Sequence, residues 1–233
     1  MIDNNPLLEL ENVGVCYRRK RGVFGEAFWA LKDVSFKLYH GETLGVIGRN
    51  GVGKSTLLRL MAGIIKPNRG QFTNNGYHVS LLSMQLGFTG YLTGRENILL
   101  SGMLMGLRRH EIYEKMDAII EFSELGEFIE RPIATYSSGM VARLGFSIAL
   151  QAEPDILLID EILGVGDEEF SQKSMKAMRE RIKSNKTIVF VSHNAVLVQQ
   201  LCDRVVWIEE GVTRAEGDTT AVLNDYHHFL HVG

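Results

Sequence analysis

Short apolar runs alternate with amphipathic stretches along most of the chain, and this alternation predicts an α/β fold. Apolar runs bounded by turn residues are typical of buried strands, whereas apolar residues three and four apart predict helices packed on a sheet. Strands are expected at 7–17, 31–38, 43–47, 79–82, 155–161 and 187–191, with a closing hairpin at 205–215. Helices are expected at 55–62, at 141–151, around 175–182 and at 222–230.

From residue 87 to residue 153 the pattern changes to helices alone. Thr93 and Glu96 form a capping-box pattern, in which the two residues satisfy each other's backbone at the start of a helix. Leu and Met are frequent in the helix that follows, at 97–107; they are read as subdomain core, or in part as a docking face, since Met adapts to irregular partners. The pattern therefore predicts one domain, 1–233, in which a helical subdomain of about 87–153 is inserted into a core of 1–86 and 154–233.

Residues 48–56 match the phosphate-binding pattern G-x-x-x-x-G-K-[ST] at every fixed position, between an expected strand and an expected helix. The glycines let backbone N–H groups surround phosphate oxygens, and the N-terminus of the helix favours negative charge. Lys54 is expected to reach the β- and γ-phosphates, and the Ser55 hydroxyl to bind Mg²⁺. The nucleotide-binding residues predicted here are Gly48, Asn50, Gly51, Gly53, Lys54, Ser55 and Thr56.

The apolar strand expected at 155–161 ends in two carboxylates, Asp160 and Glu161. Asp160 is expected to hold Mg²⁺, and Glu161 to orient and deprotonate an attacking water. A pair of solvated acids is the alternative, and it explains poorly why the pair follows a complete phosphate loop. His193, just after the strand at 187–191, is expected at the same edge of the sheet, where it can contact a γ-phosphate; a structural histidine is the alternative.

A second anion site is indicated at residues 137–140, just before the expected helix at 141–151. Ser137 can cap that helix, while Ser138 and Gly139 leave its N-terminus open to an oxyanion. An ordinary Ser-Gly helix cap would explain these residues equally well if they stood alone.

Three further residues have less specific sequence signals. Tyr17 is the aromatic residue best placed to stack on adenine, with Trp29 as the second candidate, and packing at a sheet edge is the alternative for both. Gln85, at the expected end of a strand, can reach Mg²⁺ or the attacking water, although a loop glutamine is commonly just solvated. The basic run 18–21 is read as a solvated hairpin tip, or as a contact to phosphate or a membrane surface.

Composition narrows the class of protein only modestly. A net charge of −3, with both signs mixed, gives no general attraction to nucleic acid or anionic lipid. The two cysteines, Cys16 and Cys202, form no metal or redox pattern, which favours a reducing compartment. No secretory signal and no apolar run near the roughly 20 residues of a membrane span is visible. A role at a membrane would therefore require a partner.

The order of these features resembles the nucleotide-binding subunits of ABC transporters over nearly the whole chain. Residues 48–56 match the Walker A loop, 156–161 match Walker B with its catalytic glutamate, and 164–167 match the D-loop. Gln85 falls close to the Q-loop, and His193 matches the switch histidine. The resemblance implies a P-loop NTPase (RecA-like) core with an antiparallel β subdomain and an inserted helical subdomain.

The family's signature Ser-Gly-Gly-Gln is replaced by Ser137, Ser138, Gly139 and Met140. Together with Leu-Thr-Gly-Arg-Glu-Asn-Ile at 92–98, this departure resembles the branch that exports teichoic acids, O-antigens or capsular polysaccharides. The chain stops soon after the last expected hairpin, without room for the carbohydrate-binding domain that some O-antigen exporters carry. This favours a teichoic-acid exporter, with an O-antigen or capsular exporter as the alternative.

The resemblance also implies cofactors and partners. ATP and Mg²⁺ are the expected cofactors, with Ser55, Asp160 and Gln85 around the metal. A head-to-tail homodimer would hold each ATP between the Walker A loop of one chain and Ser137 and Gly139 of the other. A transmembrane permease would contact the glycan and keep this chain at the cytoplasmic face of the membrane. A rival reading is a soluble ATPase acting on ribosomes or DNA, but such proteins usually carry two ATPase domains or long coiled coils.

Overall fold

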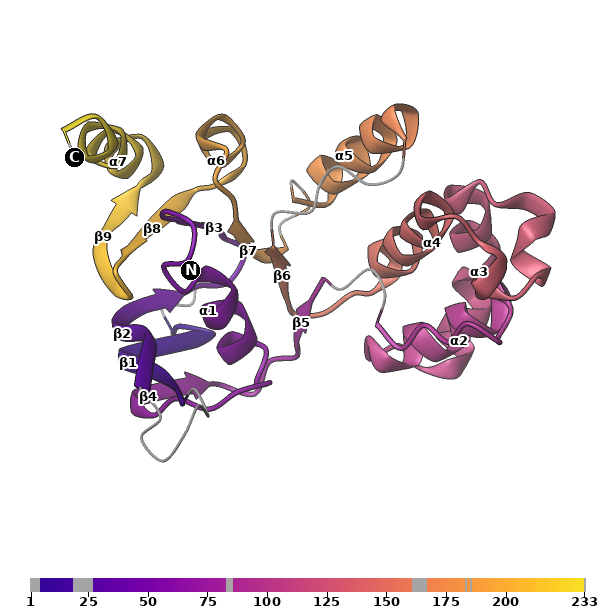
Figure 1. Ribbon diagram of the computed structural model, residues 1–233, viewed down its shortest axis with the longest axis horizontal. Helices are drawn as coiled ribbons and strands as arrows, with labels where there is room; N and C mark the ends of the chain where they lie inside the picture. Colours follow the sequence, from indigo (N-terminus) through magenta and orange to yellow (C-terminus); the bar gives the residue numbers. More distant parts are fainter. Residues whose placement is uncertain are drawn as a thin grey trace. The chain divides into compact units, whose positions relative to one another are not determined.

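The computed structural model describes residues 5–18, 27–82, 86–160, 167–182, 184 and 186–232. Its strands form one nine-stranded sheet in the order β4-β1-β2-β9-β8-β3-β7-β6-β5 (Figure 1). The strands are β1 (Leu8–Arg18), β2 (Ala27–Leu38), β3 (Thr43–Ile47), β4 (Arg69–Asn74), β5 (Val79–Leu81), β6 (Ile156–Asp160), β7 (Thr187–Val191), β8 (Arg204–Glu209) and β9 (Val212–Asp218). β3, β5, β6, β7 and β8 run parallel, and β1, β2 and β4 pair antiparallel. The expected α/β core with an antiparallel β subdomain is confirmed.

Helices cover both faces of the parallel strands. Alternate residues of a strand point to opposite faces, and in β3 Leu44 and Val46 belong to the core that includes α1 (Lys54–Met61). Gly45 points to the other face, where a Cβ would lie 3.0 Å from Cys202 Sγ, just after α6 (Ala195–Leu201). The C-terminal helix α7 (Thr219–Val232) packs on β8 and β9. The parallel strands β3, β6 and β7 are thus buried on both faces, as their almost entirely apolar residues require.

Two elements of the sheet and its covering helices, one strand and one helix, have no counterpart among the expected ones. β4, which begins at Arg69 and pairs with β1, was not among the expected strands. β4 is a mostly exposed edge strand, so it lacks the apolar alternation that identifies a half-buried strand. Helix α6 was not expected; the side chain of Asn194 caps it by accepting hydrogen bonds from the N–H groups of Val196 and Leu197, at 3.0 and 3.2 Å.

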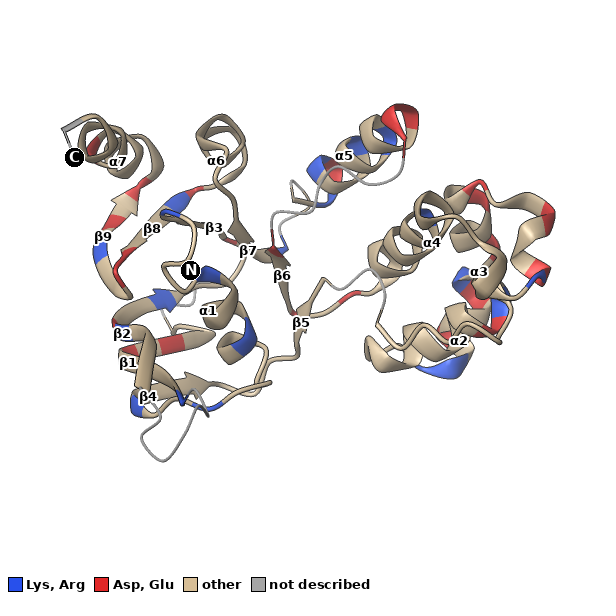
Figure 2. Ribbon diagram, in the orientation of Figure 1, with Lys and Arg blue, Asp and Glu red and all other residues tan. Residues whose placement is uncertain are grey.

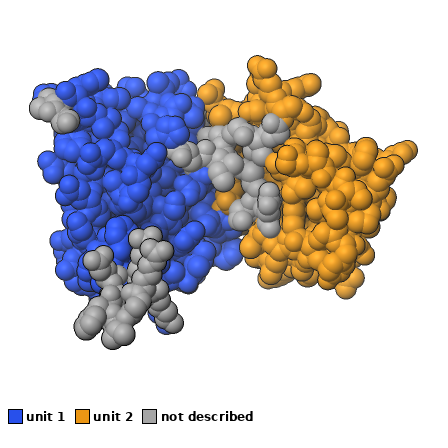
Figure 3. Space-filling view, in the orientation of Figure 1, with its two compact units in different colours: residues 1–81, 155–161, 182–233 blue, residues 82–154, 162–181 orange. Residues whose placement is uncertain are grey.

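The contacts divide the chain into two units, one of residues 1–81, 155–161 and 182–233, and one of residues 82–154 and 162–181 (Figure 3). The second unit is helical, with α2 (Gly94–Leu104), α3 (Arg109–Ser123), α4 (Ser138–Gln151), α5 (Glu168–Ile182) and two short 3₁₀ turns, Gly126–Glu130 and Ile133–Thr135. The boundaries predicted for one inserted subdomain, 87–153, stay a prediction. None of the helices in the described residues is long and apolar enough to cross a lipid bilayer.

Helix α5 is fastened to α4 within the helical unit. Phe122, Phe146 and Phe170 form an aromatic cluster with ring centroids 5.7 to 6.2 Å apart. Arg181 donates hydrogen bonds to the carbonyls of Leu150 and Ala152 at the C-terminal end of α4, where a helix leaves carbonyls unpaired. Figure 2 shows acidic residues in the first turn of α5 and basic residues in its last turn, the distribution that the helix dipole favours.

The segment Thr-Gly-Arg-Glu-Asn begins α2 and is held by a polar network. The predicted capping box is confirmed: the Glu96 N–H donates to the Thr93 hydroxyl at 3.2 Å, and the Thr93 N–H donates to the Glu96 carboxylate at 2.8 Å. Asn97 is fully buried, and its amide nitrogen lies 2.8 to 3.1 Å from the carbonyl oxygens of Thr89, Leu92 and Thr93. Its amide oxygen accepts the Thr89 N–H at 2.8 Å. This one side chain therefore fixes the turn that precedes α2.

We expect Asn97→Ala to lower the free energy of unfolding of the helical unit by about 2–4 kcal/mol, because several buried backbone groups lose their partner. Asn75→Ala is the matched control, since Asn75 is exposed and its side chain donates a single hydrogen bond, to the Pro6 carbonyl at 2.7 Å; we expect it to cost less than about 1 kcal/mol. Urea unfolding followed by circular dichroism measures both. Equal losses in the two variants would contradict the network's importance.

Candidate functional site

The phosphate loop joins β3 to α1 and follows a path that requires glycine. Gly48, Gly51 and Gly53 have φ of 149°, 83° and 106°, values that other residues rarely adopt. A Cβ on Gly48 would lie 2.1 Å from the Ile208 carbonyl oxygen, and one on Gly53 would lie 2.3 Å from the Ala30 carbonyl oxygen. At Gly51 no described atom lies within 4 Å of such a Cβ, so the requirement there comes from the backbone angle.

Lys54 is buried with its ammonium group inside this loop. Its side chain is 9% exposed, and Nζ donates to the carbonyl oxygens of Gly48 at 2.7 Å and Arg49 at 3.0 Å. The loop thus surrounds a positive charge at the start of α1, whose own N-terminus also favours anions. This is the arrangement expected for binding a phosphate group.

Ser55 and Asp160 meet beside the loop, although 105 positions separate them in the sequence. The Ser55 hydroxyl donates to the Asp160 carboxylate at 3.0 Å. Oxygen ligands of this kind suit Mg²⁺, which usually takes one or two protein ligands and completes its shell with water and phosphate. The two residues therefore fit the predicted metal site, and their assignment to Mg²⁺ stays a prediction.

The parallel register explains why these residues converge. Val46 of β3 and Asp160 of β6 both pair with Val191 of β7, so the three strands end at the same level of the sheet. His193 comes two residues after Val191, just beyond the end of β7, which lies between β3 and β6 in the sheet, and it is exposed. The structure thus brings His193 to the expected edge, and its contact with a γ-phosphate stays a prediction.

The signature residues lie in the helical unit, at the start of α4. Ser137 caps this helix, since its hydroxyl accepts the Met140 N–H at 3.2 Å. Ser137 and Ser138 are exposed, and a Cβ on Gly139 would meet nothing within 4 Å among the described atoms except the Ser137 hydroxyl, at 3.8 Å. The first turn contains no acidic residue. It therefore presents an open helix N-terminus, as an anion site requires.

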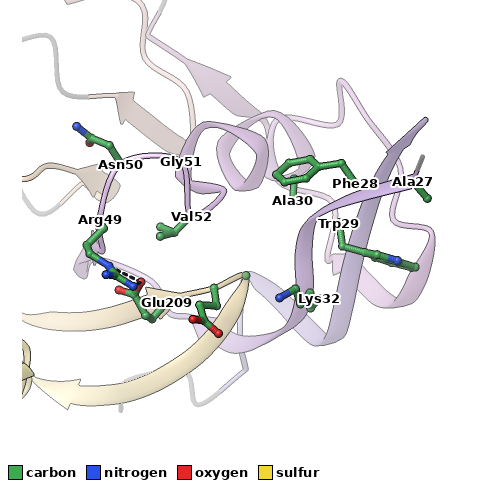
Figure 4. Close-up of a pocket in the computed structure, with 12 residues that line it drawn as sticks. Ala27, Phe28, Trp29, Ala30, Lys32, Arg49, Asn50, Gly51, Val52 and Glu209 are labelled. Carbon is green, nitrogen blue, oxygen red and sulfur yellow. Dashed lines mark hydrogen bonds and ion pairs between the residues drawn. The ribbon is translucent and has the colours of Figure 1, made fainter. Parts of the chain in front are cut away.

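A cavity of about 620 Å³ adjoins the phosphate loop in the first unit (Figure 4). Its lining includes Phe28 and Trp29 of β2, whose side chains point in different directions in Figure 4. The guanidinium of Arg69 lies 5.4 Å from the ring centre of Trp29, so that ring already has a partner. Tyr17 is not among the described residues that line the cavity, but it pairs with Phe28 across β1 and β2. The choice between Tyr17 and Trp29 for adenine stacking stays a prediction.

Two features of this cavity, Phe28 and the pair of Arg49 with Glu209, were not predicted from the sequence. Phe28 is 59% exposed next to the loop, and its only sequence signal was its position beside Trp29. Arg49 forms an ion pair with Glu209 of β8. No local pattern predicts that pair, because its members are 160 positions apart.

Several predicted residues lie outside the described part of the chain, namely Gln85, Glu161 and residues 164–166. Asp167, which follows them, is described. The pKa of its carboxyl lies below the usual value because the carboxylate accepts a hydrogen bond from the Phe170 N–H and pairs with Arg143 of α4. Asp167 thereby caps α5 and links the end of the predicted D-loop to the signature helix.

Comparisons with known proteins identify the family of the chain. The family model described as "ABC transporter" matches residues 31–164. The O-antigen export system ATP-binding protein RfbB of Klebsiella pneumoniae is 52% identical over 202 residues, which are 87% of this chain and 82% of that protein. The teichoic acids export ATP-binding protein TagH of Enterococcus faecalis is 52% identical over 204 residues, which are 88% of this chain and 45% of that protein.

A solved structure shares the fold. It is a dimeric post-hydrolysis state of an ATP-binding cassette bound to ADP and Pi, and it is similar with a TM-score of 0.73 and 23% identity over 91% of this chain and 98% of that one. The resemblance proposed from the phosphate loop, the Asp-Glu pair and the signature segment is thereby confirmed at the level of family and fold. The chain belongs to the ABC transporter family, in which it is an ATP-binding and ATP-hydrolysing cassette.

Proposed function

We propose that this chain is the subunit that binds and hydrolyses ATP to power export of a lipid-linked cell-surface polysaccharide through a separate transmembrane subunit. Within the structure, the proposal depends most on the hydrogen bond between Ser55 and Asp160 beside a phosphate loop that encloses Lys54. The export role is supported by RfbB and TagH, both named for export systems and both 52% identical over most of this chain.

Teichoic acid and O-antigen remain the two candidate substrates. Relatives named for each kind match this chain equally well, so identity does not separate them. The preference for teichoic acid stated in the sequence analysis stays a prediction, as does the capsular alternative. The chain spans 45% of TagH, so what the rest of that protein does is not carried over.

The geometry suggests how the described residues would act on ATP. Lys54 would exchange its contacts with the Gly48 and Arg49 carbonyls for phosphate oxygens as these enter the loop. Ser55 and Asp160 would hold Mg²⁺, which when bound offsets the negative charge of the phosphates. Glu161 would accept the proton of the attacking water, and His193 would hydrogen-bond the γ-phosphate.

A second copy of the chain would complete the site. The open N-terminus of α4 at Ser137 offers N–H groups to a phosphate, which makes sense if that phosphate is held by the Walker A loop of a partner chain. ATP would then close the dimer and hydrolysis would reopen it, a population shift driven by γ-phosphate contacts.

The permease would contact the helical unit, which would keep the chain at the cytoplasmic face of the membrane. Helix α2 ends in exposed apolar side chains, with Met103 44% and Leu104 54% exposed. Leu86 is 37% exposed, and it lies near the end of α2, since a Cβ on the adjacent Gly87 would lie 2.2 Å from a side-chain carbon of Leu104. Apolar groups exposed close together are the kind of surface that a protein partner covers. This agrees with the part of the Leu and Met pattern that the sequence suggested as a docking face.

Lys54→Ala should weaken ATP binding by about 10- to 100-fold, because a charge-assisted contact to phosphate is lost. Lys66→Ala is the matched control: Lys66 is exposed beyond the end of α1, and its removal should leave affinity within about twofold. Titration with a fluorescent ATP analogue measures both. Unchanged affinity in Lys54→Ala would contradict the assigned role.

Glu161→Gln should lower ATP hydrolysis by roughly 10²- to 10⁴-fold while ATP still binds, since only the proton acceptor is removed. Dimers should then accumulate at saturating ATP, visible by size-exclusion chromatography with light scattering. Glu168→Gln, in the exposed first turn of α5, is the control and should hydrolyse ATP normally. Only monomers, or undiminished turnover, in Glu161→Gln would overturn the prediction.

The export role is tested in the cells from which the chain comes. Replacing the native chain by the Glu161→Gln form should remove one polysaccharide from the cell surface and accumulate its lipid-linked form inside. Chemical analysis of the accumulated glycan then distinguishes a teichoic acid, with its phosphodiester-linked units, from an O-antigen. Normal surface polysaccharides in cells with the inactive form would overturn the export proposal and leave the ATPase assignment standing.

A further inference from the structure

Glu209 is a buried carboxylate beside the phosphate loop. It ends β8 and is 3% exposed, and its Oε1 lies 2.7 Å from Nε of Arg49 and 2.5 Å from one of the terminal guanidinium nitrogens. Its other oxygen lies 3.5 Å from the Trp207 indole nitrogen. Burying a carboxylate destabilises the folded state unless the carboxylate has a partner of opposite charge, and for Glu209 that partner is Arg49.

Arg49 belongs to the phosphate loop, but its side chain points away from the loop's interior. Figure 4 shows the guanidinium directed at Glu209, while the neighbouring Asn50 points elsewhere. The pKa of Arg49 is raised, first by the hydrogen bond to Glu209 and then by its charge. The phosphate-facing charge of the loop is instead Lys54, which bonds the backbone carbonyl of Arg49 at 3.0 Å.

The C-terminal helix provides a second contact for Arg49. Its guanidinium carbon lies 5.3 Å from the centre of the Phe229 ring of α7, within the range of a cation–π interaction. The Phe229 ring also lies 5.1 Å from that of Trp207, and Arg214 of β9 lies over both rings. The Arg49 side chain is thus held by a strand end and a helix that are 160 and 180 positions downstream of it.

This arrangement has an electrostatic consequence for ATP. A triphosphate in the loop would lie near Glu209, and two negative groups in a partly buried site repel each other more strongly than in water. Arg49 neutralises Glu209 before any ligand arrives, so the negative charge that still lines the cavity is that of the exposed Glu210, while Lys54 and the start of α1 attract the ligand. Without Arg49, the buried carboxylate would oppose the ligand.

We propose that Arg49 acts on ATP binding through Glu209: Arg49 cancels the charge of this carboxylate and is itself held by Phe229 of the C-terminal helix. Helix α7 thereby influences the affinity for ATP although it lies outside the phosphate loop. This inference rests on the proposed function, since it concerns the binding of ATP at this loop.

A charge-cancelling role and a merely structural role predict opposite signs for one variant. If the Arg49–Glu209 pair only braces the loop, Glu209→Gln weakens ATP binding as Arg49→Gln does. If Arg49 cancels a harmful charge, Glu209→Gln leaves ATP binding unchanged or strengthens it, because the repelling carboxylate is gone.

The test is a double-mutant cycle on the full chain, with ATP affinity and the KM and kcat of hydrolysis as readouts. We expect Arg49→Gln to raise the dissociation constant and KM for ATP about tenfold with little change in kcat. Adding Glu209→Gln should restore both to within about threefold of the wild type. The defect of Arg49→Gln should also shrink at high salt, since it is electrostatic.

Two further variants examine the helix contact. Phe229→Leu should raise the dissociation constant for ATP by about two- to threefold, because Arg49 loses a cation–π partner but keeps Glu209. Arg214→Gln is the matched control, since Arg214 contacts the same rings from β9 and is not among the residues that line the cavity. It should leave ATP affinity unchanged.

The outcomes separate this inference from the proposed function. A wild-type chain that binds no ATP would overturn the proposed function. A wild type that binds ATP, with no weakening in Arg49→Gln or no recovery in the double variant, would overturn the inference alone. If Arg49→Gln does not fold, Glu209→Gln by itself decides, because weaker ATP binding in that variant excludes charge cancellation.

Discussion

The parallel pairing of β3, β7 and β6 is the constraint on which the site in the first unit depends. Strands joined in this register must end together, and their ends carry the phosphate loop, His193 and Asp160. None of these residues is close to the other two in sequence, so the backbone hydrogen bonds of the sheet bring them together. The apolar residues on both faces of these strands make the sheet rigid, which is what a site with closely spaced charges requires.

The helical unit solves a different problem, because it must present a helix N-terminus rather than a sheet edge. The start of α4 at Ser137 is preceded by the segment 126–136, and this segment is fastened to the beginning of α2. The Gly94 N–H donates to the Arg131 carbonyl at 3.2 Å, and Arg95 pairs with Glu130. Gly94 itself has no room for a side chain, since a Cβ would lie 2.4 Å from the Tyr136 hydroxyl. The capping and packing contacts next to the signature residues therefore explain the Thr-Gly-Arg-Glu-Asn segment.

The strands and the phosphate loop could be predicted where a short stretch of sequence carries the pattern. The apolar runs at 43–47 and 187–191 coincide with β3 and β7, because short runs between turn residues identify buried strands. Lys54, Ser55 and the loop glycines were identifiable because a fixed spacing reflects one backbone path. Strand β4 was not predicted, because an exposed edge strand needs no apolar pattern. The pairing of Arg49 with Glu209 could not be predicted from the sequence, because the two residues are 160 positions apart and the β3–β8 register brings β8 next to the loop.

Arg49 shows why residue type is an unsafe guide to role even inside a motif. An arginine in a phosphate loop invites assignment to the phosphate, because its guanidinium matches phosphate geometry well. Here the neighbouring strand β8 supplies the carboxylate of Glu209, which is 3% exposed. A buried carboxylate without a partner would destabilise the fold, so Arg49 pairs with Glu209 instead of facing the phosphate. Arg49 is not needed for contact with the phosphates, because Lys54 and the helix N-terminus already supply positive potential from fixed positions. Pairing Arg49 with Glu209 also makes the loop's electrostatics depend on β8 and on α7, so the C-terminal part of the fold contributes to the nucleotide site without touching the nucleotide.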